Sequence, residues 1–142
     1  MNVYDMNNIL KKYFKFRIRV VRRRIRIKNK KGSKSDYLKY KDQALELVKN
    51  KLEHFNQFYN FKYNKVTVRN QSTRWGSCSR RGNINFNYRL ALLPESLTDY
   101  VVVHELCHLG EFNHSKDFWD LVARTVPDFK ERRRQLRGKN IF

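Results

Sequence analysis

Histidines spaced for metal binding stand in an apolar stretch of the second half of the chain. The stretch is Tyr100-Val-Val-Val-His-Glu-Leu-Cys-His-Leu-Gly110, and a further histidine, His114, follows soon after it. In a helix, His104 and His108 lie one turn apart on the same face, and Glu105 stands beside them. Imidazole nitrogens placed in this way can share one divalent cation, so the spacing predicts a metal site.

The metal-site prediction requires this segment to be a helix, although its three valines prefer strands. In a strand, the two histidines would lie roughly 13 Å apart, too far to share an ion that holds nitrogens at about 2.0 to 2.1 Å. A helix that is apolar on all sides is usually buried, and a buried carboxylate and two buried imidazoles need partners. A divalent cation with its bound water would satisfy them. The alternative is a chance His-Glu-x-x-His string that holds no metal.

A third histidine favours the metal-site interpretation over chance. Three of the four histidines fall within eleven residues of one another, and His114 is the last of them. Gly110 can end the helix and let the chain turn back, and Ser115 can cap the next helix immediately beside His114. The third histidine is therefore expected at a helix junction, where the backbone is firmly held.

The elements before this segment predict an α+β fold. A long helix is expected from about residue 36 to residue 60, capped by Ser35, with an apolar stripe along one side. Alternation with period two then predicts a small antiparallel sheet, in which residues 80–82 form the turn of a hairpin. The residues of the helix stripe are Leu38, Leu45, Val48, Leu52, Phe55 and Tyr59, and the apolar strand residues are Val66, Val68, Ile84 and Phe86.

Three helices are expected after the sheet. Pro94 opens the buried helix that carries the two spaced histidines. Ser115 caps a second helix, and a third starts at Pro127 and ends at Gly138. The sequence thus predicts a long N-terminal helix, a small sheet, a buried central helix and two C-terminal helices. A chain of 142 residues is enough for one domain with a real core.

The chain is strongly basic, with a formal net charge of +19 that is concentrated in two zones. The first begins at Lys11 and ends at Lys34, with thirteen Lys or Arg and no acid, and residues 130–139 hold six more against Glu131 alone. Within the first zone, apolar and cationic residues alternate over 14–20 and 25–28, which predicts two short strands with one cationic face. That face could contact the phosphates of a nucleic acid, or its charge could keep an edge hairpin soluble.

Neither secretion nor a membrane span is expected. No apolar h-region follows a charged start, and no apolar run approaches eighteen residues. The two cysteines, Cys78 and Cys107, are too few for a disulfide framework, so reduced thiols and a cytoplasmic location are expected. Cys107 points about 100° away from His108 around the helix, which favours a small core residue over a ligand.

Four motifs together resemble those of one metallopeptidase family. They are Thr73-Arg-Trp-Gly-Ser-Cys78, Asn85-Phe-Asn-Tyr88, Val103-His-Glu-Leu-Cys-His108, and Phe112-Asn-His-Ser115 with Phe118-Trp119. From about residue 37 to residue 137, the chain resembles the YgjP-like metallopeptidase family, relatives of the SprT-like and WLM zinc proteases. The resemblance implies a minimal zincin-like metallopeptidase domain over residues 35–138, with a basic strand and loop region, 1–34, before it and a tail, 139–142, after it.

The same resemblance implies the site residues. Zinc would be held by His104, His108 and His114, with Glu105 as the catalytic acid and base. The three histidines also match the ligand spacing of metzincins. Glu111 stands where metzincins have a glycine, and no methionine follows for a Met-turn, so the chain is not placed in that clan. Glu111 is a weak competitor for the place of third ligand.

Three imidazole ligands would leave the fourth tetrahedral position open for water, as in catalytic zinc sites. Zinc would lower the pKa of that water, and Glu105 could take its proton and pass it to a leaving amine. The prediction is a zinc-dependent peptidase acting on a peptide or protein.

Two alternatives stay open. One is a metal-dependent hydrolase of an anionic substrate such as a nucleotide, which needs Arg or Lys near the metal. The other is a nucleic-acid-associated protease or binding protein that uses the basic zones.

The surroundings of the site are less well defined by the sequence. The strand at residues 84–87 is a candidate edge for aligning a substrate by β-addition. Tyr88, Asn87 and Arg74 are candidates for stabilising the oxyanion. Trp75 is expected to pack in the core rather than to line a cleft, because large aromatic side chains dominate cores.

Overall fold

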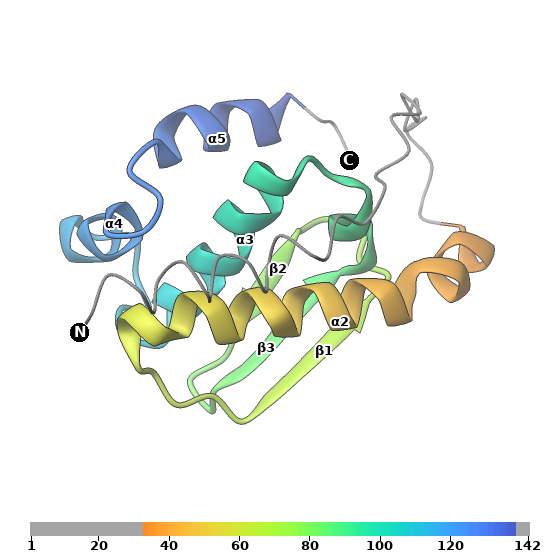
Figure 1. Cartoon of the computed structure of the whole chain (residues 1–142), viewed down its shortest axis with the longest axis horizontal. Helices are drawn as coiled ribbons and strands as arrows, with labels where there is room; N and C mark the ends of the chain where they lie inside the picture. The colour runs from red at the N-terminus through yellow and green to blue at the C-terminus, as the bar shows by residue number, and fades with distance from the viewer. Residues whose placement is uncertain (1–32, 139–142) are drawn as a thin grey trace, which may run out of the picture.

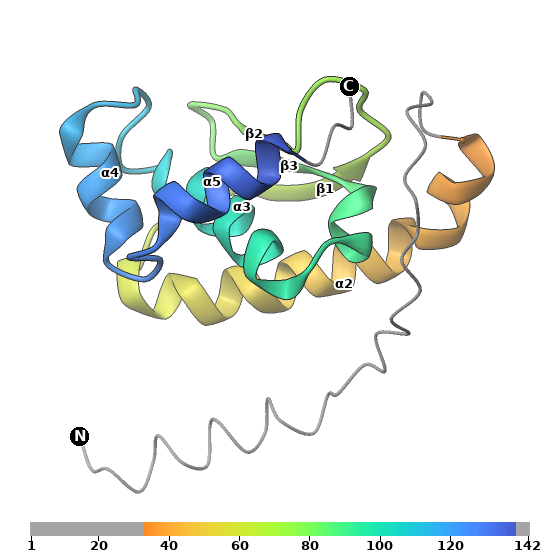
Figure 2. The same cartoon turned by 90° about the horizontal axis from the view of Figure 1, so that it is seen from above.

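Residues 33–138 are described by the computed structural model, and they form helices packed on a small sheet. Helices α2 and α3 lie on the same side of the sheet, and α5 lies along α3 (Figure 1, Figure 2). The elements are α2 (Lys34–Tyr59), β1 (Lys65–Arg69), β2 (Gly76–Cys78), β3 (Asn83–Asn87), the 3-10 helix η1 (Tyr88–Leu92), α3 (Glu95–Cys107), α4 (Lys116–Ala123) and α5 (Phe129–Arg137).

The predicted α+β class is confirmed, with its long first helix, buried central helix and two C-terminal helices. The basic strands predicted at residues 14–20 and 25–28, and the tail at 139–142, lie outside the described residues. Among the helices of residues 33–138, none combines the length and the apolar composition that a bilayer span requires.

The sheet is mixed, whereas the sequence predicted a wholly antiparallel one. Its strand order is β1-β3-β2, with β2 antiparallel to β3, as predicted for the hairpin, and β1 parallel to β3. Residues 70–75 cross the end of β3 before β2 begins, and Asn87 fastens this crossing by donating side-chain hydrogen bonds to the carbonyls of Gln71 and Arg74. The prediction failed because alternation shows which face of a strand is buried, not which strand lies beside it.

The strand order also decides which edge is open. β3 is the central strand, so the prediction that residues 84–87 form an edge for a substrate is wrong. The edges of this sheet are β1 and β2, and β2 is the edge that packs against α3. Within residues 33–138, the strand edge near the central helix is therefore that of β2.

Helix α2 covers the sheet with a face that differs partly from the predicted stripe. Its buried residues are Ala44, Val48 and Leu52. Leu38 is 54% exposed, so its predicted place in the stripe was wrong. Tyr37 turns inward instead, donating from its hydroxyl to the carbonyl of Val68 and meeting the ring of Tyr88 edge-on.

Helix α3 is apolar and buried along most of its length, as the sequence predicts. It packs against α2, β2, α4 and α5, and this burial on several sides overrides the strand preference of its valines. The helix ends at Cys107, which is fully buried, and His108 is its C-cap. In the turn that follows, a Cβ on Gly110 would lie 2.8 Å from the ring of Phe61, so close packing requires the glycine there.

A partly buried ion pair ties α2 to α3. Lys51 donates to Asp99 and, at 3.0 Å, to Glu95. The side chains of Lys51 and Asp99 are 13% and 21% exposed. Burial raises the pKa of Asp99, and Lys51 opposes that rise. We expect Lys51→Ala to lower the free energy of unfolding by about 2 kcal/mol, because it leaves a partly buried carboxyl without its cation.

Urea denaturation at neutral pH measures this change. The matched control is Lys116→Ala, which removes an exposed pair with Asp120 one turn along α4. The control should change stability far less, because solvent screens exposed pairs. Equal losses in the two variants would show that burial does not strengthen the Lys51 contact.

Candidate metal centre

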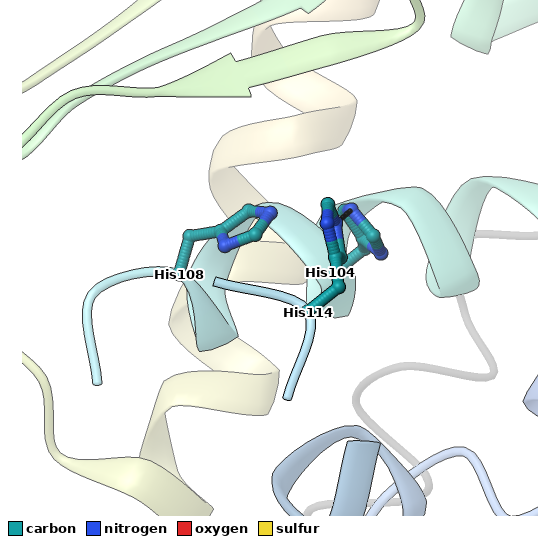
Figure 3. A group of neighbouring side chains, drawn as sticks. All are labelled: His104, His108 and His114. Atoms are coloured by element: carbon teal, nitrogen blue, oxygen red, sulfur yellow. Dashed lines mark hydrogen bonds between the residues drawn. The ribbon is translucent and has the colours of Figure 1, made fainter. Parts of the chain in front are cut away.

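Three histidine side chains converge at the end of α3. His104 lies on α3, His108 caps it, and His114 lies in the loop that leads to α4. Figure 3 shows the three rings gathered together, with the Nε2 atoms of His104 and His114 3.2 Å apart. One nitrogen from each ring lies within 4.8 Å of the other two. The structure therefore brings together the three histidines that the sequence singled out.

The spacing of these nitrogens fits a divalent metal ion. Ligand nitrogens about 2.0 to 2.1 Å from a tetrahedral ion lie roughly 3.3 Å from one another, which is close to the distance between His104 and His114. Within residues 33–138, the group of potential ligands contains the three histidines and no carboxylate or thiol. Glu111 is not part of it. A metal at this centre would therefore have three imidazole ligands.

Aromatic side chains from α4 hold the imidazole rings in place. Phe118 contacts all three rings, with centroid distances of 4.9 Å to His104, 4.5 Å to His108 and 4.9 Å to His114. Trp119 stacks on His114, with ring centroids 5.6 Å apart. Because these contacts restrict the imidazoles before any metal binds, less side-chain freedom is lost on binding.

The backbone beside His114 is also fixed by hydrogen bonds. Ser115 caps α4, as predicted, by accepting from the main-chain N–H of Phe118. The side chain of Asn113 accepts from the N–H of Ser115 at 3.0 Å. Two short-range hydrogen bonds thus bracket the third histidine at the helix junction.

The surroundings of His104 and His108 favour neutral imidazoles, which are the form that binds metals. Burial, aided by the neighbouring imidazoles and by Arg133, lowers the pKa of His104 to about 3. Burial also lowers the pKa of His108, against the effect of a hydrogen bond to the carbonyl of Glu111. That 3.0 Å bond occupies Nδ1 of His108 and leaves Nε2 free to act as a ligand.

His104 is oriented by packing rather than by hydrogen bonding. Its Nδ1 atom is buried and makes no hydrogen bond within the described part of the chain. The ring instead meets Tyr100 edge-on at 5.7 Å and lies 5.9 Å from Trp119. An unpaired buried nitrogen costs free energy. Nε2, the other ring nitrogen of His104, is the atom that faces His114.

Glu105 lies next to the histidines along α3 but beneath strand β2. Its side chain is 6% exposed, and burial raises its pKa to about 8 against the opposing charge of Arg74. A Cβ on Gly76 of β2 would come within 2.7 Å of the Glu105 side chain, including its carboxylate oxygen. The absence of a side chain at Gly76 therefore makes room for the carboxylate.

The role of Gly76 was missed from the sequence. The usable signal is a glycine inside a short strand, because such a glycine often marks the close approach of another group. Trp75, one residue before, packs against the core as predicted.

The structure narrows the candidates for stabilising an oxyanion. The side-chain amide of Asn87 already makes three hydrogen bonds to the main chain. Tyr88 is 2% exposed and packs toward α2. Arg74 is exposed, and its charge acts on Glu105. Of the three candidates, Arg74 alone remains free to face a substrate.

A buried HExxH helix with a third histidine beside it, in an α+β domain, is the arrangement of a metal-dependent peptidase. A family model described as YgjP-like, metallopeptidase domain, matches residues 10–139. Because this match covers most of the chain, the protein belongs to the YgjP-like metallopeptidase family.

A solved structure gives a second line of support. The crystal structure of the metallopeptidase zymogen of Pyrococcus abyssi abylysin is 26% identical in sequence, with a TM-score of 0.60. The similarity covers 66% of this chain and 94% of that chain. No match was found among curated proteins. The family and this neighbour together support a metal-dependent peptidase.

Removing the third histidine tests the centre directly. We expect His114→Ala to weaken metal binding at least about 100-fold, because only two imidazoles would remain. Competition with a chromophoric chelator measures the affinity. His54→Ala, which removes a histidine of α2 outside the cluster, should leave the affinity unchanged. Equal affinity in wild-type protein and His114→Ala would exclude His114 as a ligand.

The close approach of Gly76 to the Glu105 side chain gives a second prediction. Gly76→Ala should lower peptide hydrolysis about 100-fold while metal affinity stays within a few-fold of wild type, because the new methyl group displaces the carboxylate and not the imidazoles. Gly138→Ala is the control, since a Cβ there meets nothing closer than 3.5 Å. Normal hydrolysis by Gly76→Ala would show that the position of the Glu105 carboxylate is not critical.

Proposed function

We propose that the protein is a zinc-dependent peptidase in which His104, His108 and His114 hold the metal and Glu105 transfers protons. The observation that carries this proposal is the convergence of three imidazole nitrogens within 4.8 Å at the end of a helix whose buried carboxyl lies next to them. The family assignment supports hydrolysis of peptide bonds.

The donor set supports zinc in a catalytic rather than a structural role. Nitrogen ligands suit zinc, and three protein ligands leave one tetrahedral position open, whereas structural sites close with four ligands that usually include thiolates. Neither cysteine belongs to the cluster. Cys107 is fully buried, and burial raises the pKa of the Cys78 thiol to about 11, which keeps it protonated at neutral pH.

A metal ion bound here would act as a Lewis acid toward a water molecule and the scissile carbonyl. Glu105 would accept a proton from the attacking water and donate it to the departing amine. Its pKa of about 8 in the metal-free protein, raised by burial, places proton uptake and release near neutral pH. Arg74, whose charge acts on Glu105, is the group best placed to stabilise negative charge on the carbonyl oxygen.

The open edge of β2 offers a way to align an extended substrate. β2 packs against α3, and Gly76 within it lies directly over Glu105. A peptide that pairs with this edge would pass beside the carboxylate, with its main chain fixed by hydrogen bonds. The substrate alignment that the sequence predicted at residues 84–87 is therefore proposed at β2 instead.

One observation supports the alternative of a nucleotide hydrolase. The charge of Arg133 acts to lower the pKa of His104, and the charge of Arg74 acts to lower that of Glu105. A hydrolysis screen should therefore include nucleoside triphosphates beside peptides. Nucleic-acid binding by the basic zone from Lys11 to Lys34 stays a prediction, since most of that zone lies outside the described residues. A cytoplasmic location also stays a prediction.

Replacing the proton carrier tests the mechanism. We expect Glu105→Gln to lower kcat for peptide hydrolysis at least about 1,000-fold, because the amide cannot accept the proton of the water. Metal content, measured by elemental analysis, should be unchanged, since Glu105 is not in the ligand group. Glu46→Gln, an exposed change on α2, is the matched control. Full activity of Glu105→Gln would refute the catalytic assignment.

A further inference from the structure

Arg133 of α5 contacts the ring of Trp119, which in turn contacts the histidine cluster. Its guanidinium carbon stands 5.0 Å from the centroid of the Trp119 ring. Trp119 in turn stacks on His114 at 5.6 Å and lies 5.9 Å from His104. A guanidinium held against an indole keeps its N–H donors available at its edges, so Arg133 is a fixed cation with free donors.

The neighbours of Arg133 on the same helix are paired with acids, whereas Arg133 is not. Arg132 pairs with Asp128 at 2.9 Å, and Arg134 pairs with Glu131 at 2.6 Å. Within residues 33–138, Arg133 makes the cation–π contact with Trp119 and no ion pair with a carboxylate. Arg133, which contacts the ring that stacks on His114, is thus left without a carboxylate partner in the described part of the chain.

A second arginine reinforces the charge on this side of the centre. Arg137 follows Arg133 by one helical turn, and α5 packs against α3. Residues one turn apart lie on the same side of a helix, so Arg133 and Arg137 lie on one side of α5.

Arg133 and Arg137 are exposed, so solvent screens part of the repulsion between their charges and a metal, and a bound anion can relieve the rest. Each positive charge near His104 repels a divalent ion bound by that ring. An anion between the arginines and the centre removes this repulsion and gains charge-assisted hydrogen bonds. The free guanidinium edge matches a planar carboxylate, which can accept two parallel N–H donors.

The placement on α5 favours a carboxylate over a phosphate. Arg133 lies in the middle of α5 and Arg137 is its last residue, where the macrodipole is negative and opposes dense negative charge. Phosphate sites instead use helix N-termini and clustered N–H groups. A singly charged carboxylate needs only the two arginines.

We infer that Arg133, supported by Arg137, forms a cationic subsite beside the metal centre that binds a carboxylate of the substrate. This inference rests on the proposed peptidase function and adds a substrate class to it. The preferred peptides carry an acidic side chain, or their own C-terminal carboxylate, close to the scissile bond. Arg133 is thus a specificity residue, not a ligand or a proton carrier.

The test compares four peptides of one uncharged sequence that differ at a single feature. One is neutral with an amidated C-terminus, one carries glutamate near its centre, one carries lysine there, and one has a free C-terminus close to the cleavage point. Wild-type protein loaded with zinc should cleave a carboxylate peptide with a kcat/KM at least about fivefold above that of the neutral peptide. The glutamate and free C-terminus peptides distinguish the two sources of the carboxylate.

Variants of the subsite should change this preference, measured as the ratio of kcat/KM for the carboxylate peptide to that for the neutral peptide. Arg133→Gln should bring this ratio close to one. Arg133→Lys should retain part of the preference, and Arg133→Glu should shift it toward the lysine peptide. Arg134→Gln, which removes the same charge from the next residue, is the matched control. If Arg133 only supported Trp119, its replacement would lower cleavage of every peptide equally, and that result would overturn the inference.

Binding to the zinc-loaded Glu105→Gln protein separates this inference from the proposed function. Calorimetry should show that the preferred carboxylate peptide binds at least about fivefold more tightly than the neutral peptide, and that Arg133→Gln in this background removes the difference. Absence of cleavage by the wild-type protein would count against the peptidase proposal alone. Equal binding of carboxylate and neutral peptides would count against the subsite. Tighter binding of a nucleoside triphosphate than of either carboxylate peptide would overturn the carboxylate assignment.

Discussion

Burial of Glu105 within an apolar helix is the constraint on which the rest of the site depends. The residues of α3 give it almost no polar face, so the helix is stable only when other elements cover it on several sides. Its carboxyl group is taken out of water by that packing, and its pKa rises to about 8. The same packing lowers the pKa of His104 to about 3. One physical cause thus gives the carboxyl and the imidazole the protonation properties that the proposed function requires of them.

Strand β2 has to cover α3 without a clash with the Glu105 carboxylate, and this requirement explains the glycine within the strand. A strand that packs directly over Glu105 would normally press a side chain onto the carboxylate, and Gly76 avoids that clash. β2 can be short because Asn87 anchors the crossing segment before it and a tight turn at Gly82 follows it. The result is a strand that packs against α3 and forms an edge of the sheet in the part of the chain that the structure describes.

The sequence predicts those parts of the molecule whose causes are local. The spacing of His104 and His108 has chemical meaning only in a helix, and the cap at Ser115 is a short-range signal beside His114. The parallel pairing of β1 with β3 depends instead on where residues 70–75 cross the sheet, which no local pattern records. The sequence identified Arg133 only as part of the basic zone at residues 130–139. Its contact with Trp119 could not be predicted, because that contact depends on how α5 packs against the domain.

The large positive charge of the chain raises the question of how a divalent cation can bind at all. Charges on exposed side chains beyond about 10 Å are largely screened at 0.1 M salt, so the net charge of +19 matters less than the few groups beside the centre. There, the candidate ligands are imidazoles rather than acids, and nearby positive charge comes from different elements, with Arg74 before β2 and Arg133 on α5. With the proposed carboxylate subsite, the repulsion between Arg133 and a bound metal would be relieved when an anionic group of the substrate binds beside Arg133. Metal and anion would then stabilise each other's binding, because such a coupling is reciprocal.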